Sequence, residues 1–336
     1  MNIRFPNGTV LLENPPHIIS SAAVGGKKEG EGPLGDYFSY IVKEGHFGQR
    51  TWEKGEMELQ KEALQFAVDV SPISLTDINF IFSGDLLNQC IASSFAHRST
   101  DASFIGMYGA CSTFAEGLAL SAMFVNSGYA DYSACCVSSH FCSAERQYRF
   151  PVEYGGQRPP TSQWTVTGAG AAFLSAEGVG PTVTACTIGS ITDLGIKDAN
   201  NMGAAMAPAA LSTIRAHFED TKSGPEDFDL IVTGDLGQHG KDALLTLAQN
   251  EGIPLGGKIC DCGTMVFDLL KQDVHSGGSG CGCSAITLCG YLLDQLHKRK
   301  YKKILFCGTG ALLSPTSTQQ GLPIPGVCHA ISICGG

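Results

Sequence analysis

The chain contains an internal repeat, and this feature limits the possible folds more than any other. Residues 77–86 read DINFIFSGDL and residues 227–236 read DFDLIVTGDL, so five of ten positions are identical at an offset of 150. Each copy has an acidic start, a mostly apolar run typical of a buried strand, a hydroxyl residue and then Gly-Asp-Leu. A pattern of this length, repeated within one chain, predicts two halves of similar topology.

A second matched pair of segments extends the repeat. In the first half, a Cys-Ser pair precedes a helical pattern and an apolar strand: Cys111-Ser112, 113–126 and 132–138. The second half has the same order: Cys283-Ser284, a helix that should end near residue 299, and 302–310. The two Cys-Ser pairs are 172 positions apart, and the strands that follow them align without a gap.

Each half also has a helix with apolar residues on one face, predicted at 56–70 in the first half and at 242–249 in the second. The apolar strands suit sheets that helices cover on both faces. We therefore expect an α/β fold built from two duplicated halves, 1–178 and 179–336. An active or binding cleft is expected where the halves meet.

The composition excludes several classes of protein. A formal net charge of −10 argues against a nucleic-acid partner. No run approaches the roughly 18 apolar residues of a membrane span, and the first residues lack the pattern of a signal peptide. We expect a chain with no transmembrane segment of its own, either cytosolic or held at a membrane by a partner.

The fourteen cysteines fall mostly in apolar stretches, where a free Cys acts as a small buried hydrophobic residue. Two Cys-x-Cys pairs, Cys260/Cys262 and Cys281/Cys283, could suggest zinc. Structural zinc sites usually separate their ligands by two or more residues, so this spacing is unfavourable. The pattern therefore favours reduced, buried thiols and no metal site.

Cys111 is the first candidate for a functional residue. It lies between a turn of small residues, in the string MYGACST at 107–113, and the predicted helix. Unpaired backbone N–H groups and the helix dipole at such a position favour the thiolate, which is the nucleophilic form. The alternative is a residue that remains only because a small side chain fits a tight helix start.

With these features in view, the chain resembles the thiolase and ketoacyl synthase superfamily. Within it, the chain is most similar to the stage V sporulation protein AD family, through long shared strings. These strings are GDLLNQ at 84–89, GACST at 109–113, SSH at 138–140, AERQ at 144–147, P-x-EYGGQ at 151–157, APAA at 207–210, HSGGSGCGCS at 275–284 and GTGALLSP at 308–315. The resemblance implies a five-layer αβαβα thiolase-like fold, a homodimer and a role in handling dipicolinic acid (pyridine-2,6-dicarboxylate) during sporulation. It further implies association with the membrane-bound subunits of the same uptake machinery, at the cytoplasmic face or periphery of the spore inner membrane.

The resemblance also indicates which catalytic groups to look for. A condensing enzyme needs two further groups, His with His or Asn, to transfer protons and to bind the enolate oxygen. His275 precedes a Gly-rich turn, as one catalytic His of the thiolases does. In thiolases that His lies between Gly and Pro, whereas Val274 and Ser276 flank His275. The alternative is a turn residue that is hydrogen-bonded to the backbone. After the strand 230–232, where the enzymes have His or Asn, this chain has Thr-Gly-Asp-Leu-Gly. Cys111 and His275 are therefore at most vestigial catalytic residues.

The stronger binding feature is the segment 139–149 with the loop that follows it, predicted over 146–165. Arginines form bidentate pairs with planar carboxylates, and a neighbouring hydroxyl, imidazole or aromatic ring would suit dipicolinate. The proposed ligand-binding residues are Cys111, Ser139, His140, Arg146, Arg149 and Arg158, with Tyr148 or Trp164 for stacking. The alternative for the arginines is a solvated or ion-paired loop.

Three functions follow from these observations. The first is a non-catalytic protein that binds dipicolinate, free or as its calcium chelate, with no cofactor. The second is an acyl-CoA-dependent acyltransferase of the thiolase or ketoacyl synthase type that uses Cys111. The third is a structural subunit that docks on a membrane complex.

Overall fold

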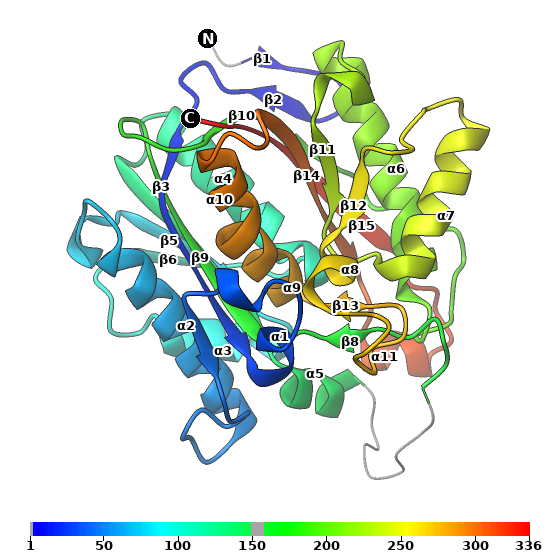
Figure 1. Cartoon of the computed structure of the whole chain (residues 1–336), viewed down its shortest axis with the longest axis horizontal. Helices are drawn as coiled ribbons and strands as arrows, with labels where there is room; N and C mark the ends of the chain where they lie inside the picture. The colour runs from blue at the N-terminus through cyan, green and yellow to red at the C-terminus, as the bar shows by residue number, and fades with distance from the viewer. Residues whose placement is uncertain (1–2, 149–157) are drawn as a thin grey trace.

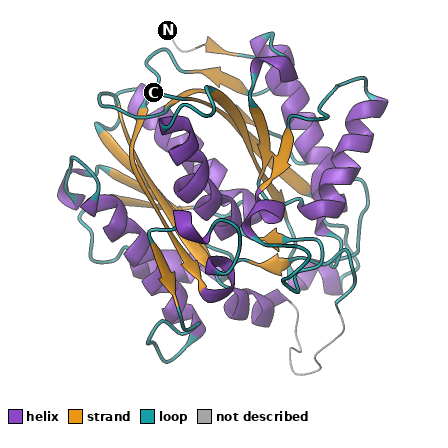
Figure 2. Cartoon of the chain, in the orientation of Figure 1, coloured by secondary structure: helices purple, strands orange, loops and turns teal. Residues whose placement is uncertain are grey.

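The computed structural model describes residues 3–148 and 158–336, and it has five layers. The main sheet is continuous through both halves of the chain, and its two halves, called the first and the second sheet below, alternate with three layers of helices (Figure 1, Figure 2). Helix α2 (Trp52–Asp69) covers the outer face of the first sheet, and α6 (Met202–Thr221) with α7 (Gly237–Asn250) covers the outer face of the second. Helices α4 (Thr113–Asn126) and α9 (Cys281–Ile286) lie between the sheets and pack on both.

The two halves have the same strand order. In the first half, the order is β3 (His17–Gly26), β9 (Gly168–Ser175), β7 (Tyr132–Ser139), β5 (Phe80–Gly84) and β6 (Ser103–Gly106). In the second half, it is β10 (Thr182–Ile188), β15 (Gly326–Cys334), β14 (Lys303–Ala311), β11 (Leu230–Thr233) and β12 (Ile259–Asp261). The four successive pairings are antiparallel, antiparallel, parallel and parallel in both halves. The duplication predicted from the repeat is confirmed at the level of topology.

The halves are joined at their edges. Strands β3 and β10 meet through one residue pair, His17 with Thr182. Among the shorter strands, β1 (Ile3–Arg4) pairs with β2 (Thr9–Leu11), β2 with β10, and β4 (Tyr40–Val42) with β3. Strand β8 (Trp164–Thr165) pairs with β13 (Gly278–Ser279), which also links the halves. The predicted boundary at residue 178 falls in the connection between β9 and β10 and stays a prediction.

Most predicted elements are present, with shifted ends. Helix α4 spans the predicted residues, whereas α2 begins four residues early because the Thr51 hydroxyl accepts a hydrogen bond from Lys54 N–H and caps it. The helix after β13 begins at Cys281, two residues before Cys283, and continues through a π-helical turn (Thr287–Leu292) into α10 (Leu293–His297). The predicted 146–165 loop is wrong at both ends, since α5 (Phe141–Tyr148) includes its first residues and β8 its last.

Small residues allow the middle layer to pack closely. A Cβ atom on Gly308 of β14 would lie 2.3 Å from the Cβ of Ala115 on α4, so the helix approaches the strand as only glycine allows. All fourteen cysteines are free thiols, and eleven of them are buried, as the sequence predicted. Within the described part of the chain, no helix is long and apolar enough to cross a membrane.

Candidate functional site

The Cys111 thiol lies at a tight turn between β6 and α4. Residues Ala110–Ser112 form one 3-10 turn, and Ala110 has a left-handed backbone with φ of 51°. The Thr113 hydroxyl holds this turn, because it donates to the Ala110 carbonyl at 2.6 Å and accepts from Gly109 N–H at 3.0 Å. The turn therefore places a buried thiol, 6% exposed, against a pocket at the end of the central helix.

This Cys111 pocket encloses about 600 Å³, a volume that includes space open to solvent. Residues of both halves line it, as expected of a cleft between duplicated halves: Leu86, Tyr108, Ala110, Cys111, Ala144, Glu145, Tyr148, Thr165, Ala199, Asn200, Met202, Ser279, Ala311 and Leu313. Glu145 is the one charged side chain among these described residues, and no histidine is among them. The remaining polar groups are neutral hydroxyl, amide and thiol groups.

Behind the thiol lies Asp235, which follows β11 where the condensing enzymes carry His or Asn. Its carboxyl is fully buried and accepts hydrogen bonds from Gly280 N–H at 2.9 Å and the Thr309 hydroxyl at 2.8 Å. The Asp235 carboxylate is also near enough to the Cys111 thiol for its charge to raise the pKa of the thiol. Burial raises the pKa of Asp235 to about 7.

The expectation of a thiolate at Cys111 is wrong. Burial raises the pKa of the Cys111 thiol well above its ordinary value, and the charge of Asp235 raises it further. The Gly280 backbone N–H lowers the thiol pKa, but by less than burial and the Asp235 charge raise it. Loss of solvation and a neighbouring carboxylate thus outweigh the backbone donors at the helix start, and the thiol stays protonated near neutral pH.

Two tyrosines close one side of the pocket. The Tyr148 hydroxyl donates to the Leu86 carbonyl at 2.6 Å, and the Tyr108 hydroxyl bonds to it in turn. Burial raises the pKa of Tyr108 to about 12, so its phenol is neutral. The sequence argument named Tyr148 but missed Tyr108, although Tyr108 adjoins the Cys111 motif. It also missed Asn200, which comes from a loop of the other half and has no motif of its own.

Two buried acids, Glu56 and Asp85, accept hydrogen bonds next to the walls of the pocket that Leu86 and α5 form. Glu56 of α2 accepts hydrogen bonds from Ser138 at 3.0 Å and from Ser143 of α5 at 2.7 Å. Asp85, next to Leu86, accepts from the backbone and hydroxyl of Ser93. Burial raises the pKa of both carboxyls, and the charge of Asp85 raises that of Glu56 further. In the described chain, no group of three or more His, Cys, Asp or Glu residues could hold a metal ion.

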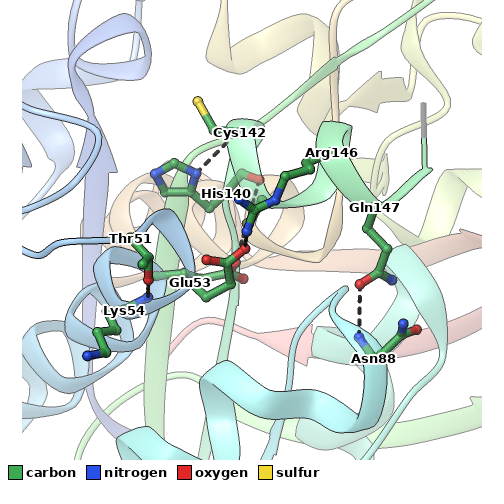
Figure 3. Close-up of polar contacts among 10 residues, drawn as sticks. Thr51, Glu53, Lys54, Asn88, His140, Cys142, Arg146 and Gln147 are labelled. Carbon is green, nitrogen blue, oxygen red and sulfur yellow. Dashed lines mark hydrogen bonds and ion pairs between the residues drawn. The ribbon is translucent and has the colours of Figure 1, made fainter. Parts of the chain in front are cut away.

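The predicted residues Ser139 and His140 do not line the Cys111 pocket. Ser139 is buried, donates to the Val166 carbonyl at 2.7 Å and accepts from Gly282 N–H at 3.1 Å. His140 lines a separate pocket of about 590 Å³. Its Nε2 donates to the Gly45 carbonyl at 2.6 Å and its Nδ1 accepts from Cys142 N–H at 3.1 Å (Figure 3). Both ring nitrogens are therefore used within the protein.

Two of the three predicted arginines are described, and each has a carboxylate partner on a different element. Arg146 pairs with Glu53 of α2 (Figure 3). Arg158 pairs with Asp273 at 2.8 Å, and His275 lies 3.4 Å from the same carboxylate. Arg149 lies outside the described residues. Among the predicted residues, then, Cys111 and Tyr148 share a pocket, and the assignment of the others as ligand-binding residues stays a prediction.

The proposed stacking residue Trp164 already has partners. Its ring stacks on Phe141 with centroids 3.8 Å apart and an interplanar angle of 9°. The Lys28 ammonium group lies 3.8 Å from the Trp164 centroid, which places it over the opposite face. A ligand ring could stack on Trp164 only after one of these partners moved.

Comparison with solved structures identifies the class of fold. The chain is similar to 3-oxoacyl-[acyl-carrier-protein] synthase III of Aquifex aeolicus VF5, with 14% identity, a TM-score of 0.56, and coverage of 95% of this chain and 99% of that chain. It is also similar to OleA of Xanthomonas campestris crystallised with cerulenin, with 15% identity, a TM-score of 0.62, and coverage of 96% and 97%. The fold is therefore thiolase-like, as predicted.

The sequence comparison is more specific. The family model of stage V sporulation protein AD matches residues 6–334. Stage V sporulation protein AD of Bacillus subtilis (strain 168) is 40% identical over 323 residues, which cover 96% of this chain and 95% of the relative. The chain belongs to the stage V sporulation protein AD family, a family of sporulation proteins.

Proposed function

We propose that the chain is a non-catalytic binding protein for dipicolinate that acts in its uptake into the developing spore. The observation that carries the non-catalytic part is the burial of the Cys111 thiol beside the Asp235 carboxyl, because burial and the charge of Asp235 both raise the pKa of the thiol. It leaves a protonated thiol, with a carboxyl group where proton-transfer chemistry needs His or Asn. The choice of dipicolinate rests on the family resemblance given above.

The Cys111 pocket supports a small planar carboxylate as ligand. The Asn200 amide supplies a neutral donor, and Leu86 and Leu313 supply apolar surface for a ring. The O–H groups of Tyr148 and Tyr108 already donate within the protein. Neutral donors can pair with a carboxylate without an arginine.

Calorimetric titration with dipicolinate tests the proposal. We expect Asn200→Ala to weaken binding about tenfold or more, since a hydrogen bond to a charged group contributes about 1.5–3 kcal/mol. Arg146→Ala and His140→Ala test the residues predicted from sequence, and Lys302→Ala is the surface control. Parallel titrations with and without calcium identify the bound form. No heat at millimolar ligand in either series would refute the function.

The second candidate is acyl transfer through Cys111, which the position of the thiol at the pocket floor favours. Acetyl-CoA followed by intact-mass measurement separates the two functions, because transfer requires a covalent adduct that Cys111→Ala abolishes. We expect no adduct.

We also propose a homodimer and a membrane-bound partner. Strand β6 is at the edge of its sheet, and among described strands it pairs with β5 alone, while Phe104 on it is 40% exposed. A second copy could extend the sheet there. Light scattering should then give twice the chain mass, and Phe104→Lys should lower the measured mass.

The membrane subunits of the stage V uptake complex are proposed as partners at the spore inner membrane, and co-purification with them is the test.

A further inference from the structure

The turn between α10 and β14, called the basic turn below, gathers positive charge in an acidic chain. Residues 297–303 read HKRKYKK, so five of the 22 lysines and arginines occupy six consecutive positions, whereas the formal net charge of the chain is −10. The side chains at 297–300 and at 302 are exposed. The sign of the charge at this small surface is therefore opposite to that of the whole molecule.

The first half has a turn with the same backbone and a different charge. Just after each central helix, one residue has a left-handed backbone: Gly128 with φ of 73° and Arg299 with φ of 56°. Each of them donates its N–H to the carbonyl three residues earlier, at 3.0 Å in both turns. The next strand then starts with two N–H groups that donate to one side chain, Asn79 in the first half and Asp229 in the second. Because residues 127–132 read SGYADY, this turn geometry requires no lysine or arginine.

Arg299 occupies a position that favours glycine. A left-handed backbone is strained for a residue with a side chain and unstrained for glycine, which the first half has at the equivalent position. The Arg299 Nε donates to the Gly336 carbonyl at 3.3 Å, at the surface of the molecule. The backbone of the turn therefore does not account for the arginine, and its charge does.

Asp294 and Asp229 each neutralise part of the basic turn. The Lys298 ammonium group pairs with Asp294 at 2.7 Å, and the Asp229 carboxylate accepts the backbone N–H groups of Lys302 and Lys303 at 2.6 and 3.1 Å. The bond from Lys302 holds the pKa of Asp229 below its ordinary value, so this acid is charged at neutral pH. Five cations against these two acids leave the turn positive.

Exposed apolar and aromatic side chains lie beside the cations. Val179 is 86% exposed and adjoins the turn, since a Cβ on the next residue, Gly180, would lie 3.6 Å from the His297 ring. Tyr37 is 38% exposed, and the Lys298 ammonium group lies 6.0 Å from its ring centroid. Tyrosine and aliphatic side chains among lysines are typical of a surface that meets the headgroups of a bilayer.

We infer that the basic turn binds the surface of a membrane that contains anionic lipids. Lysine is a compact charge on a flexible stem, which suits lipid phosphates that have no fixed arrangement. The negative charge of the whole chain argues against a nucleic acid as the partner. The inference goes beyond the proposed function, because it requires neither dipicolinate nor a membrane subunit.

The place of the turn in the fold sets the orientation of the bound chain. Ser279 lines the Cys111 pocket, α9 begins two residues later, and the helical run continues to His297, next to the basic turn. A run of this length spans about 25 Å. Figure 1 shows it leading from β13 towards the end of the molecule where the C-terminus lies. The Cys111 pocket therefore faces away from the bilayer when the turn is bound to it.

Co-sedimentation of the full-length chain with vesicles tests the inference. We expect binding to phosphatidylcholine vesicles with about one-third phosphatidylglycerol, and none to phosphatidylcholine alone. Binding should be lost between about 50 mM and about 500 mM NaCl, because salt screens exposed charges. Lys300→Ala with Lys302→Ala should weaken binding about 25-fold, at about fivefold for each cation near an anionic surface. Lys43→Ala with Lys54→Ala removes the same charge at exposed positions elsewhere and should change binding by less than about twofold.

Arg299→Gly separates the charge from the fold. It gives the basic turn the residue that the first half has there, so binding should weaken about fivefold while the midpoint of urea unfolding does not fall. Dipicolinate titration should be the same for the parent chain and the turn variants. A failure of that titration bears on the proposed function alone.

Tryptophan fluorescence tests the orientation. The two tryptophans are Trp164, on β8 beside the pocket, and Trp52, whose ring lies 5.4 Å from the Arg146 guanidinium of α5. Brominated phosphatidylglycerol quenches tryptophans that contact lipid, so it should leave the fluorescence of the bound chain unchanged. Quenching would overturn the orientation.

Two results would overturn the inference itself: no binding to the anionic vesicles at low salt, or equal weakening by the Lys43 and Lys54 variant. Binding to membrane subunits in phosphatidylcholine vesicles, abolished by the turn variants and without any binding to the anionic vesicles, would assign the turn to a protein partner instead of a lipid surface.

Discussion

Glu29→Gln should make the folded chain less sensitive to rising pH. The Glu29 side chain, in α1 (Lys27–Gly30), is fully buried, and its carboxyl accepts a hydrogen bond from Thr167 N–H at 2.9 Å. Burial raises its pKa from 4.5 to about 7, against the smaller effect of the Thr167 bond. The folded chain therefore holds this proton more tightly than the unfolded chain does.

The sign and size follow from that shift. The stability that Glu29 contributes is complete below pH 4.5, the unfolded value, and is lost as the pH rises through about 7, the folded value. The rise in pKa from 4.5 to about 7 corresponds to about 3 kcal/mol of lost stability. Integrating the linkage relation between these two values places roughly 2 kcal/mol of the loss between pH 5.5 and pH 8.5.

Urea unfolding at pH 5.5 and pH 8.5 measures this loss. Glutamine keeps an oxygen to accept from Thr167 N–H but cannot ionise, so Glu29→Gln should lose about 2 kcal/mol less than the parent chain over this interval. Other buried acids with raised pKa, such as Glu56, add the same background to both proteins. Glu31→Gln, on an exposed side chain two residues away, is the matched control. Equal losses in the parent chain and Glu29→Gln would refute the assignment of a neutral buried acid.

Two further predictions concern the thiol and the middle layer. Iodoacetamide at pH 7.5 should modify Cys111 more slowly than the partly exposed Cys334, because burial and Asp235 suppress its thiolate, and Asp235→Asn should increase the Cys111 rate. Peptide mass spectrometry gives both rates, and early labelling of Cys111 in the parent chain would contradict the prediction. Gly308→Ala should destabilise the chain by about 1–3 kcal/mol through its clash with Ala115. Gly256→Ala, where an added Cβ meets nothing within 4 Å, should stay within about 0.5 kcal/mol in the same urea assay.

The repeat and the apolar patterns were sufficient to predict an α/β fold of two similar halves, whereas its five layers came from the family resemblance. Gly-Asp-Leu at the ends of β5 and β11, and a Cys near the start of each central helix, mark related positions in two halves with the same strand order. Helix α4 could be placed to the residue because its apolar pattern has a clear start and end. The start of α2 was missed because it depends on the capping bond to Thr51, which hydrophobic periodicity does not report.

The site was harder to predict, because its residues come from distant segments and their charge states depend on burial. The arginines cluster in sequence, but Arg146 pairs with Glu53 of α2 and Arg158 with Asp273, so these two have partners on different elements. Their assignment to a ligand site stays a prediction. The helix-start argument for a Cys111 thiolate failed for a similar reason. It counted the backbone donors near the thiol but not the desolvation or the Asp235 carboxyl, which are the larger effects.

The repeated Gly-Asp-Leu motif explains why a thiol at a helix start says little about catalysis in this chain. The charge of Asp235 in the second half raises the pKa of the Cys111 thiol in the first half. The charges of Glu56 and Asp85 in the first half raise the pKa of Cys281, where α9 of the second half begins. Each half thus places an acid near a thiol of the other, which is what an ancestral two-fold arrangement would leave. The two thiols differ in access, since Cys281 is fully buried and donates to the Ser138 carbonyl at 3.0 Å, whereas Cys111 reaches a pocket. Access to that pocket, and not the shared acid–thiol pairing, is therefore what makes Cys111 the candidate for a ligand contact.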